Sequence, residues 1–286
     1  MADPLLLLPR EMLQHLFSLL PLSDLSSCVL VCRLWREVGE QPSLWRRLHM
    51  PLHFQNLGVI PLLADPFSRL AAVTKVTFYA WLVPCSEARA VLEAVQGHPG
   101  GTIRELTVRG NYFWEIPASL VSSCFTRMSR VVLNKAKLSS RQLKELLTTM
   151  SQGSTIKELE LADGDLCKVE AGTLASALTS LEKVSLDRCP LLRLQARALF
   201  QQLARPASSL QELRLHRNEL TYLPVRDLEN VHHLAVMDLS ACKLKREQVL
   251  ALLLLLLVCP LLLVTQVTRL LESAGKGTKL KMLDLR

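Results

Sequence analysis

The stretch Ile156-Lys157-Glu158-Leu159-Glu160-Leu161 follows the pattern apolar-x-x-apolar-x-apolar, and this pattern decides the fold of most of the chain. Alternation of leucines with glutamates is typical of a short β-strand with one buried and one solvent-exposed face. The same pattern begins again at Val73, Ile103, Met128, Leu181, Leu210, Leu234 and Leu280. Successive copies lie 24 to 30 residues apart as far as Leu234, and the last spacing is 46, so the sequence predicts a repeat protein.

Each copy also specifies the turn that follows its strand. The ninth position of the pattern carries Asn or Cys at Asn111, Cys189, Asn218 and Cys242, and it departs from this rule at Ala136 and Gly164. An Asn or Cys side chain here can satisfy backbone groups inside the turn, and the Cys needs no redox role. In the longer repeats, helical patterns open near Ser139 and near Gln195.

These features together resemble the leucine-rich repeat. The resemblance implies a curved α/β solenoid with parallel strands on its concave face and helices on its convex face. We expect this solenoid to cover residues 73–286. The preceding residues 51–72 are expected to form a connecting segment or a degenerate first repeat.

A different pattern occupies the first 50 residues. It begins with Leu8-Pro9-Arg10-Glu11-Met12-Leu13, continues through the turn Pro21-Leu22-Ser23-Asp24-Leu25, and ends with Trp35 and Trp45. Apolar residues at positions 13, 16, 17 and 20 predict one apolar stripe on a short helix. A segment this short cannot bury all of its apolar surface, so it requires a partner or a neighbouring domain.

The order of these N-terminal residues resembles the F-box family, which forms a trihelical unit; here it would cover residues 1–50. F-box proteins present this unit to the Skp-type adaptor of cullin ubiquitin ligases. Carried over by position, Trp35 would anchor the core, and the adaptor-binding residues would be Pro9, Glu11, Met12, Leu13, Leu16 and Phe17. The alternative is that these helices only cap the repeats that follow.

The predicted strands place a row of polar side chains on the concave face. Residues between the apolar positions of a strand point away from the core. The substrate-binding candidates on this face are Arg109, Asn134, Glu158, Glu160, Asp187, Arg214 and His216. An acidic patch at Glu158 and Glu160 is expected two repeats from a basic patch at Arg214 and His216, so the face could orient a protein partner of complementary charge.

The segment Val249–Val264 is apolar throughout and contains Pro260. It is shorter than the roughly 20 residues that span a bilayer, and Pro260 would break a helix, so a membrane span is not expected. Deleting residues 253–270 would restore a normal repeat length, which suggests a splice insertion in the last repeat. The chain then stops after a strand pattern without a capping helix, as a truncated form would.

Composition and motifs exclude several other classes of function. The net charge of +8 is spread along the chain instead of gathering with aromatic residues, so nucleic acid is not an expected partner. The histidines and cysteines show no metal-ligand spacing, and Cys28 and Cys32 form only one isolated pair. The stretch Gly275–Thr278 lacks phosphate-loop spacing, and no catalytic constellation or cofactor motif is present. Without a leader-like segment or a disulfide framework, the expected location is the cytoplasm or the nucleus.

The two resemblances predict a non-catalytic adaptor. The F-box would dock on a Skp-type adaptor and through it on the cullin ligase core, while the repeats would bind an unknown protein substrate for ubiquitination. Two alternatives stay open: a repeat scaffold or inhibitor outside any ligase, and a truncated isoform that competes for the adaptor.

Overall fold

The structure is a computed structural model of the chain. It describes residues 8–20, 22–46, 49–52, 73–79, 85–98, 103–110, 113–205, 208–228, 231 and 234–258. Internal contacts divide the chain into two compact units, Met1–Asn111 and Tyr112–Arg286.

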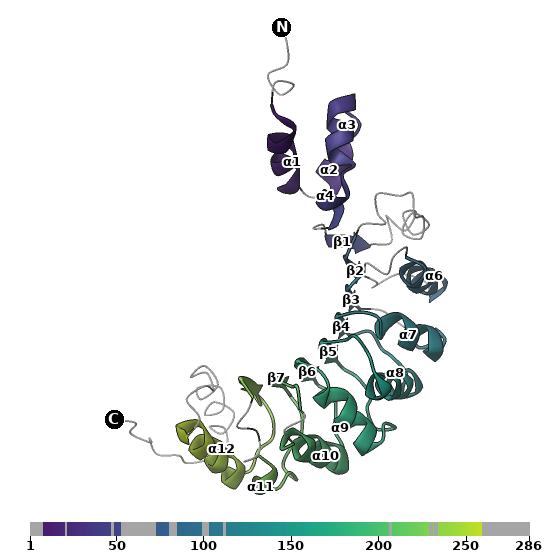
Figure 1. Ribbon diagram of the computed structural model, residues 1–286. Helices are drawn as coiled ribbons and strands as arrows, with labels where there is room; N and C mark the ends of the chain where they lie inside the picture. Colours follow the sequence, from purple (N-terminus) through teal and green to yellow (C-terminus); the bar gives the residue numbers. More distant parts are fainter. Residues whose placement is uncertain are drawn as a thin grey trace. The chain divides into compact units, whose positions relative to one another are not determined.

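The first unit begins with short helices (Figure 1). These are α1 (Arg10–Ser18), α2 (Leu22–Cys28), α3 (Arg33–Gly39) and α4 (Pro42–Arg46). Leu13, Phe17 and Val38 are buried between them, and the Phe17 ring meets the Trp35 ring edge-on with 5.3 Å between centroids. A Cβ atom on Gly39 would lie 2.5 Å from Val29 Cγ1, so α3 packs this closely only with glycine there.

The rest of the first unit contains strands in register. These elements are β1 (His49–Leu52), β2 (Lys75–Tyr79), α6 (Cys85–Gln96) and β3 (Glu105–Arg109). Strand β1 pairs in parallel with β2, and β2 pairs in parallel with β3 so that Val76 aligns with Leu106. Strand β1 lies just before residues 53–72, so most of the expected connecting segment is outside the described residues.

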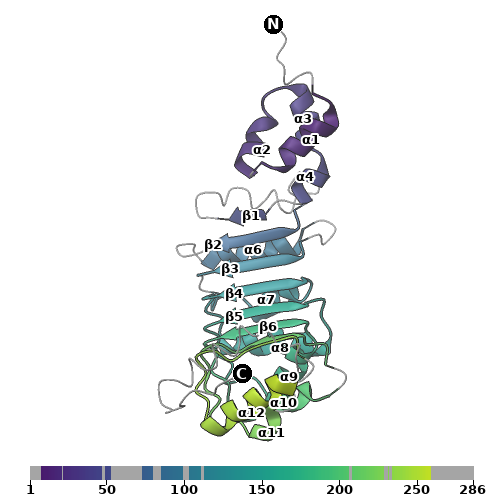
Figure 2. The same cartoon turned by 90° about the vertical axis from the view of Figure 1, so that its left-hand side faces the viewer.

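The second unit alternates helices and strands. In chain order these are α7 (Ala118–Phe125), β4 (Arg130–Asn134), α8 (Ser140–Gln152), β5 (Glu158–Ala162), α9 (Ala171–Thr179), β6 (Lys183–Asp187), α10 (Arg193–Leu203), β7 (Glu212–Arg214), α11 (Val225–Leu228), β8 (Val236–Asp238) and α12 (Arg246–Val258). Strands β4 to β8 pair in parallel and in chain order. They line the inner side of an arc whose outer side the helices cover (Figures 1 and 2), which confirms the predicted α/β solenoid for this unit.

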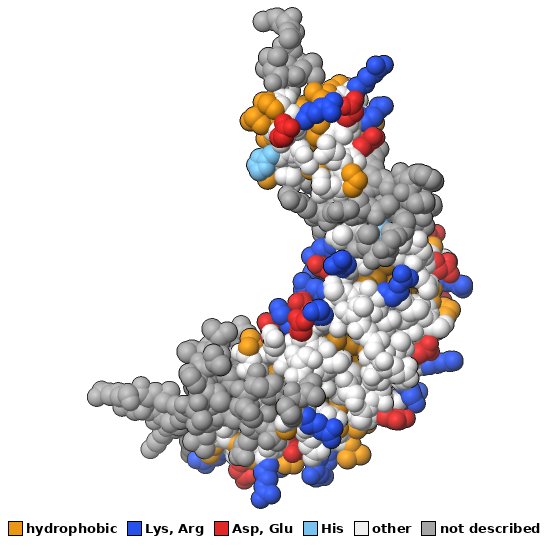
Figure 3. Space-filling view, viewed as in Figure 1, with side chains coloured by type: hydrophobic (Ala, Val, Ile, Leu, Met, Phe, Trp, Pro, Cys, Tyr) orange, Lys and Arg blue, Asp and Glu red, His pale blue; other side chains and the backbone are white. Residues whose placement is uncertain are grey.

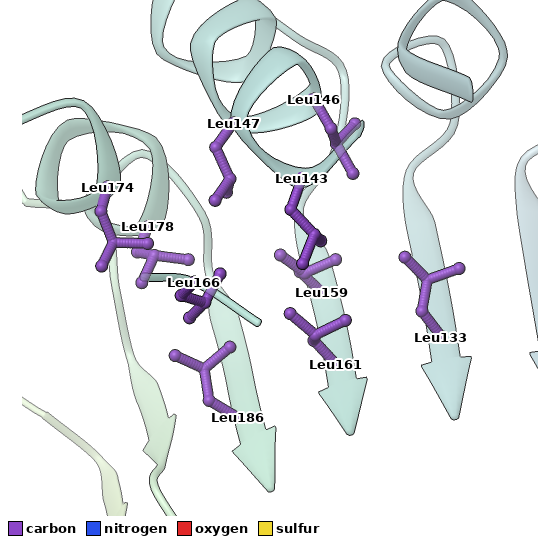
Figure 4. Close-up of a pocket in the computed structure, with 10 residues that line it drawn as sticks. All are labelled: Leu133, Leu143, Leu146, Leu147, Leu159, Leu161, Leu166, Leu174, Leu178 and Leu186. Atoms are coloured by element: carbon purple, nitrogen blue, oxygen red, sulfur yellow. The ribbon is translucent and has the colours of Figure 1, made fainter. Parts of the chain in front are cut away.

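Apolar residues of the strand pattern meet the helices to form the core. In β5, Leu159 and Leu161 are buried while Glu160 between them is exposed. Figure 4 shows leucines from β4, β5 and β6 pointing toward leucines of α8 and α9. The space enclosed by these leucines is only about 10 Å³ and has no polar lining. It is therefore a close-packed core and not a ligand cavity.

The turn after each strand repeats one backbone conformation. The residues Gly110, Lys135, Asp163, Arg188, Arg217 and Ala241, all at the eighth position of the pattern, have positive φ angles. At the next position, Asn218 Nδ2 donates to Leu186 O at 2.8 Å, and Cys242 Sγ donates to Leu215 O at 2.8 Å. Burial raises the pKa of Cys242 to about 12, so at neutral pH its thiol keeps the proton that it donates.

The departure at Gly164 has a structural explanation. Cys189 Sγ accepts from the Gly164 N–H at 3.3 Å and approaches Leu161 O at 3.4 Å, so the next repeat satisfies this turn. A Cβ atom on Gly164 would lie 2.6 Å from Leu161 Cδ2. The turn is therefore filled by its neighbours and leaves no room for a side chain.

Buried glutamines join neighbouring repeats, a feature that the strand pattern does not predict. Gln195, at the third position of α10, donates from Nε2 to Leu166 O and Val169 O, both at 2.7 Å, and accepts from the Leu192 N–H at 2.8 Å. Gln142 in α8 and Gln248 in α12 make the equivalent bonds. The three glutamines lie 53 residues apart, so the structural unit is a pair of repeats.

The apolar segment near the C-terminus is described only in part. Helix α12 covers its beginning, and residues 259–286, with Pro260, most of the suspected insertion 253–270 and the last strand pattern, lie outside the described residues. Within the described ranges, no helix has both the length and the apolar character needed to cross a bilayer.

Candidate interaction surfaces

The first candidate surface is an apolar row along α1 and its C-cap residue, Leu19. Met12, Leu16 and Leu19 lie at helical spacing, and their side chains are 53%, 43% and 70% exposed. Leu30 and Val31, in the turn after α2, are also exposed. Sequence patterns alone did not single out Leu19, Leu30 or Val31. Large apolar side chains so exposed on a small helical unit are typical of a protein-binding site.

Two of the predicted adaptor-binding residues are not on the surface. Leu13 is 1% exposed and Phe17 is 3% exposed, because both lie on the face of α1 that packs against the other helices. The expectation that they face a partner is corrected accordingly: they are core residues that hold α1 in place. A helix with two apolar faces can bury only one of them within so small a unit.

A polar hollow lies next to the apolar row. Its volume is about 210 Å³, and it is lined by Glu11, Gln14, His15, Ser18, Ser43 and Leu44. Gln14 Nε2 donates to Ser43 Oγ at 3.0 Å and so connects α1 to α4 across the hollow. Pro9 and Glu11 are exposed at the start of α1. Of the predicted adaptor-binding set, Pro9, Glu11, Met12 and Leu16 are therefore accessible to a partner.

The second candidate surface is the strand face of the second unit, where opposite charges pair across neighbouring strands. Arg130 on β4 contacts Glu158 at 3.4 Å and Glu160 at 2.9 Å on β5. Lys183 on β6 then joins Glu158 at 3.4 Å to Glu212 on β7 at 3.5 Å. Figure 3 shows acidic and basic side chains interspersed over the visible strand face. The acidic patch predicted at Glu158 and Glu160 is thus compensated within the protein.

The ends of the strands carry the other predicted residues. His216 Nδ1 lies 2.7 Å from Ser240 Oγ of the next repeat, and Arg214 contacts Glu212 at 3.4 Å. Asp187 contacts Arg188 at 3.3 Å, while its Oδ1 atom is buried and has no hydrogen-bond partner among the described residues. Asn134 is exposed at the end of β4. Arg214 therefore belongs to the ion-paired strand face, while Asn134, Asp187 and His216 lie beside it.

One further ion pair fixes a turn. Arg188 Nε donates to Asp163 Oδ1 at 2.6 Å, and its Nη2 donates to Oδ2 at 3.1 Å. This bidentate hydrogen bonding by Arg188 lowers the pKa of Asp163. Arg109, the remaining substrate-binding candidate, ends β3 in the first unit.

The cysteine pair considered as a metal site, Cys28 and Cys32, lies within the packed helices of the first unit. Cys32 Sγ accepts from the Trp35 N–H at 3.4 Å and thereby caps α3. Burial raises the pKa of Cys28, and the nearby Asp24 carboxylate makes a smaller contribution in the same direction. Among the described residues, no group of His, Cys, Asp and Glu has the geometry to hold a metal ion.

Comparisons with known proteins bear on both units. Residues 5–51 match the family model described as F-box-like. A comparison with curated proteins finds no significant match. The solved structures similar to this chain include an internalin (inlF) from Listeria monocytogenes, with 11% identity and a TM-score of 0.41, covering 65% of this chain and 46% of the internalin.

A second similar structure is that of a TLR13–ssRNA13 complex, with 15% identity and a TM-score of 0.40. That alignment covers 72% of this chain and 34% of TLR13. The chain therefore spans less than half the length of either protein. From the family match and the described fold, the chain carries an F-box-like domain at residues 5–51, followed by parallel-stranded α/β repeats of the leucine-rich type.

Proposed function

We propose that this protein is the substrate-recognition adaptor of a Skp/cullin/F-box ubiquitin ligase. The observation that carries the proposal is the exposed row of Met12, Leu16 and Leu19 within a match to the F-box-like family. The other apolar face of this helix, formed by Leu13 and Phe17, is already buried within the unit. Residues 1–50 would therefore dock as a folded unit on a Skp-type adaptor, in the cytoplasm or the nucleus.

The repeats, residues 73–286, would supply the substrate-binding part. Ion pairs across β4 to β7 hold the strand-face side chains in fixed positions, which suits a surface that must recognise one shape and charge pattern. The residues proposed to contact substrate are Arg109, Asn134, Glu158, Glu160, Asp187, Arg214 and His216. Three of them, Glu158, Glu160 and Arg214, belong to the ion-paired ladder, whose other members are Arg130, Lys183 and Glu212.

The mechanism would be proximity. Two binding surfaces on one chain turn the encounter between substrate and ligase into an event within one complex, which raises the effective concentration of substrate lysines. The bond-forming chemistry would belong to the conjugating enzyme that the cullin core recruits, so this chain would need no catalytic residue.

The test is co-purification of the full chain with a co-expressed Skp-type adaptor. Leu16→Asp places a charge in the centre of the exposed row, and we expect it to reduce adaptor recovery at least tenfold, because central apolar anchors commonly contribute about 2 kcal/mol or more. Leu250→Asp is the matched control, since Leu250 is a helical leucine of similar exposure, 39% against 43%, in the other unit.

Equal adaptor recovery with Leu16→Asp and with Leu250→Asp would refute docking through α1. If the unchanged chain binds no Skp-type adaptor at all, the scaffold interpretation takes precedence. Ubiquitination of bound proteins in a reconstituted ligase would then separate an active receptor from a chain that only competes for the adaptor.

A further inference from the structure

The charges of the second unit are distributed unequally between its strand face and one of its edges. We call the carboxyl edge the segments in which strands end and helices begin: residues 134–145, 162–173, 187–198, 215–227 and 239–248. These segments contain 13 Lys and Arg against eight Asp and Glu, an excess of five positive charges. The ion-paired ladder on the strand face has three basic and three acidic residues and is balanced.

Several basic residues of the carboxyl edge make no ion pair with the described acidic residues. Four of them are paired: Lys144 with Glu170, Arg188 with Asp163, Arg197 with Asp227 and Lys243 with Glu219. Among the described residues, no ion pair is made by the exposed side chains of Arg141, Lys168, Arg193, Arg217, Lys245 and Arg246. These cations are therefore available to an outside ligand at little cost in broken contacts.

The backbone adds to the positive potential of this edge. Helices α8, α9, α10 and α12 all begin there, immediately after the turns that follow the strands. The amino-terminal end of a helix carries a partial positive charge. Both side chains and helix dipoles thus favour an anionic partner on the carboxyl edge.

Exposed leucines lie among the charges. Leu192 and Leu194 are 51% and 72% exposed and flank Arg193 at the start of α10. The Gln195 bonds to Leu166 O and Val169 O hold the turn that carries Lys168 against this helix start.

The neighbouring repeat is fixed on the other side. The Tyr222 hydroxyl donates to Leu191 O and so packs the following turn against the same place. Arg217 lies just before that turn. The backbone N–H of Arg188 donates to His216 O at 3.1 Å, which ties this part of the chain to the preceding repeat. Adjacent repeats therefore present two leucines with Lys168, Arg193 and Arg217 around them.

From this arrangement we infer that the carboxyl edge docks an acidic segment of a protein partner, with leucine-like side chains of the segment resting on Leu192 and Leu194. Charge complementarity supplies the attraction, and the two leucines supply the apolar contact. A nucleic-acid backbone fits less well, because it offers no apolar side chain to rest on the exposed Leu192 and Leu194. The inference deepens the proposed function by giving the class of substrate, but binding itself needs no ligase.

The test uses the full chain and a fluorescein-labelled peptide of glutamates interrupted by leucines, followed by fluorescence anisotropy. We expect Arg193→Glu with Arg217→Glu to weaken binding at least tenfold, and added salt to weaken binding to the unchanged chain. Arg205→Glu with Arg33→Glu changes the net charge equally at exposed positions outside the carboxyl edge. This control pair should change the affinity less than twofold.

A second peptide, with serines in place of the leucines, tests the apolar contact. We expect it to bind the unchanged chain several-fold more weakly, and we expect Leu194→Ser to abolish the difference between the two peptides. Equal loss of binding in the two charge-reversal pairs, tighter binding of a DNA oligonucleotide than of the peptide, or no peptide binding by the unchanged chain would overturn the inference. Adaptor co-purification of the Arg193→Glu with Arg217→Glu variant should be unchanged, because both positions lie outside residues 1–50, so failure here is distinguishable from failure of F-box docking.

Discussion

Replacing Gln195 by leucine should destabilise the second unit strongly. The substitution removes two hydrogen bonds of 2.7 Å that the side chain donates and one of 2.8 Å that it accepts. Gln195 is only 2% exposed, so water cannot replace these bonds. At about 1 kcal/mol net for each bond, the expected loss is about 3 kcal/mol. For a chain of this size that corresponds to a fall in Tm of roughly 6 to 12 °C.

The assay is thermal unfolding followed by circular dichroism, with Gln201→Leu as the matched control. Gln201 lies on the same helix but is exposed, so its replacement should shift Tm by no more than about 1 to 2 °C. Equal melting temperatures for Gln195→Leu and Gln201→Leu would refute the view that the buried glutamines join the repeats.

Gln195→Glu refines the same prediction. A glutamate has nearly the same shape, but its carboxylate cannot donate to Leu166 O or Val169 O, whereas its protonated form can donate to one of them. Its pKa should therefore be higher in the folded than in the unfolded chain, so stability is present at low pH and is lost as pH rises through the folded pKa. The measurement is the difference in Tm between the variant and the unchanged chain at about pH 5 and at about pH 8. An equal difference at the two pH values would contradict this prediction.

Two further predictions concern the turns. Gly164→Ala should lower stability by about 1 to 3 kcal/mol, because its Cβ would lie 2.6 Å from Leu161 Cδ2, whereas Gly172→Ala, with open space around it, should be neutral or stabilising in a thermal melt. Asp163→Asn should lower Tm only slightly at neutral pH, because so exposed an ion pair contributes little to the free energy of unfolding. Because Arg188 lowers the pKa of Asp163, this contribution is present above the unfolded pKa and disappears as pH falls through the folded pKa, so variant and unchanged chain should converge in melts at acid pH.

The sequence predicted the strands well because each one repeats the same spacing of apolar residues. Register then follows, since parallel strands of equal length align position by position, as Leu159 aligns with Val184. The same reasoning could have predicted the pairing of Glu158 with Lys183, which occupy equivalent positions on adjacent strands. The helices α7 and α9 were harder to see, because their stretches are short and rich in Ser and Ala.

The interaction surfaces were less accessible to sequence reasoning. Helix α1 carries apolar residues on two faces, and only packing against other helices decides that Leu13 and Phe17 are inside while Met12 and Leu16 are outside. Proteins of this size routinely expose some apolar residues, so composition does not separate the two sets. The glutamine bonds were missed for a different reason: their period is 53 residues, twice the repeat length on which the strand pattern depends.

That doubled period constrains how such a chain can be lengthened or shortened. Gln142, Gln195 and Gln248 each require the turn of the repeat before them, and no glutamine of this kind is found at the starts of α7, α9 or α11. Removing one repeat would place side by side two helices that both carry this glutamine or two that both lack it. One turn would then be left without its glutamine donor. Removing or adding a pair would keep every bond. Gene duplication and protein engineering should therefore act on this solenoid two repeats at a time.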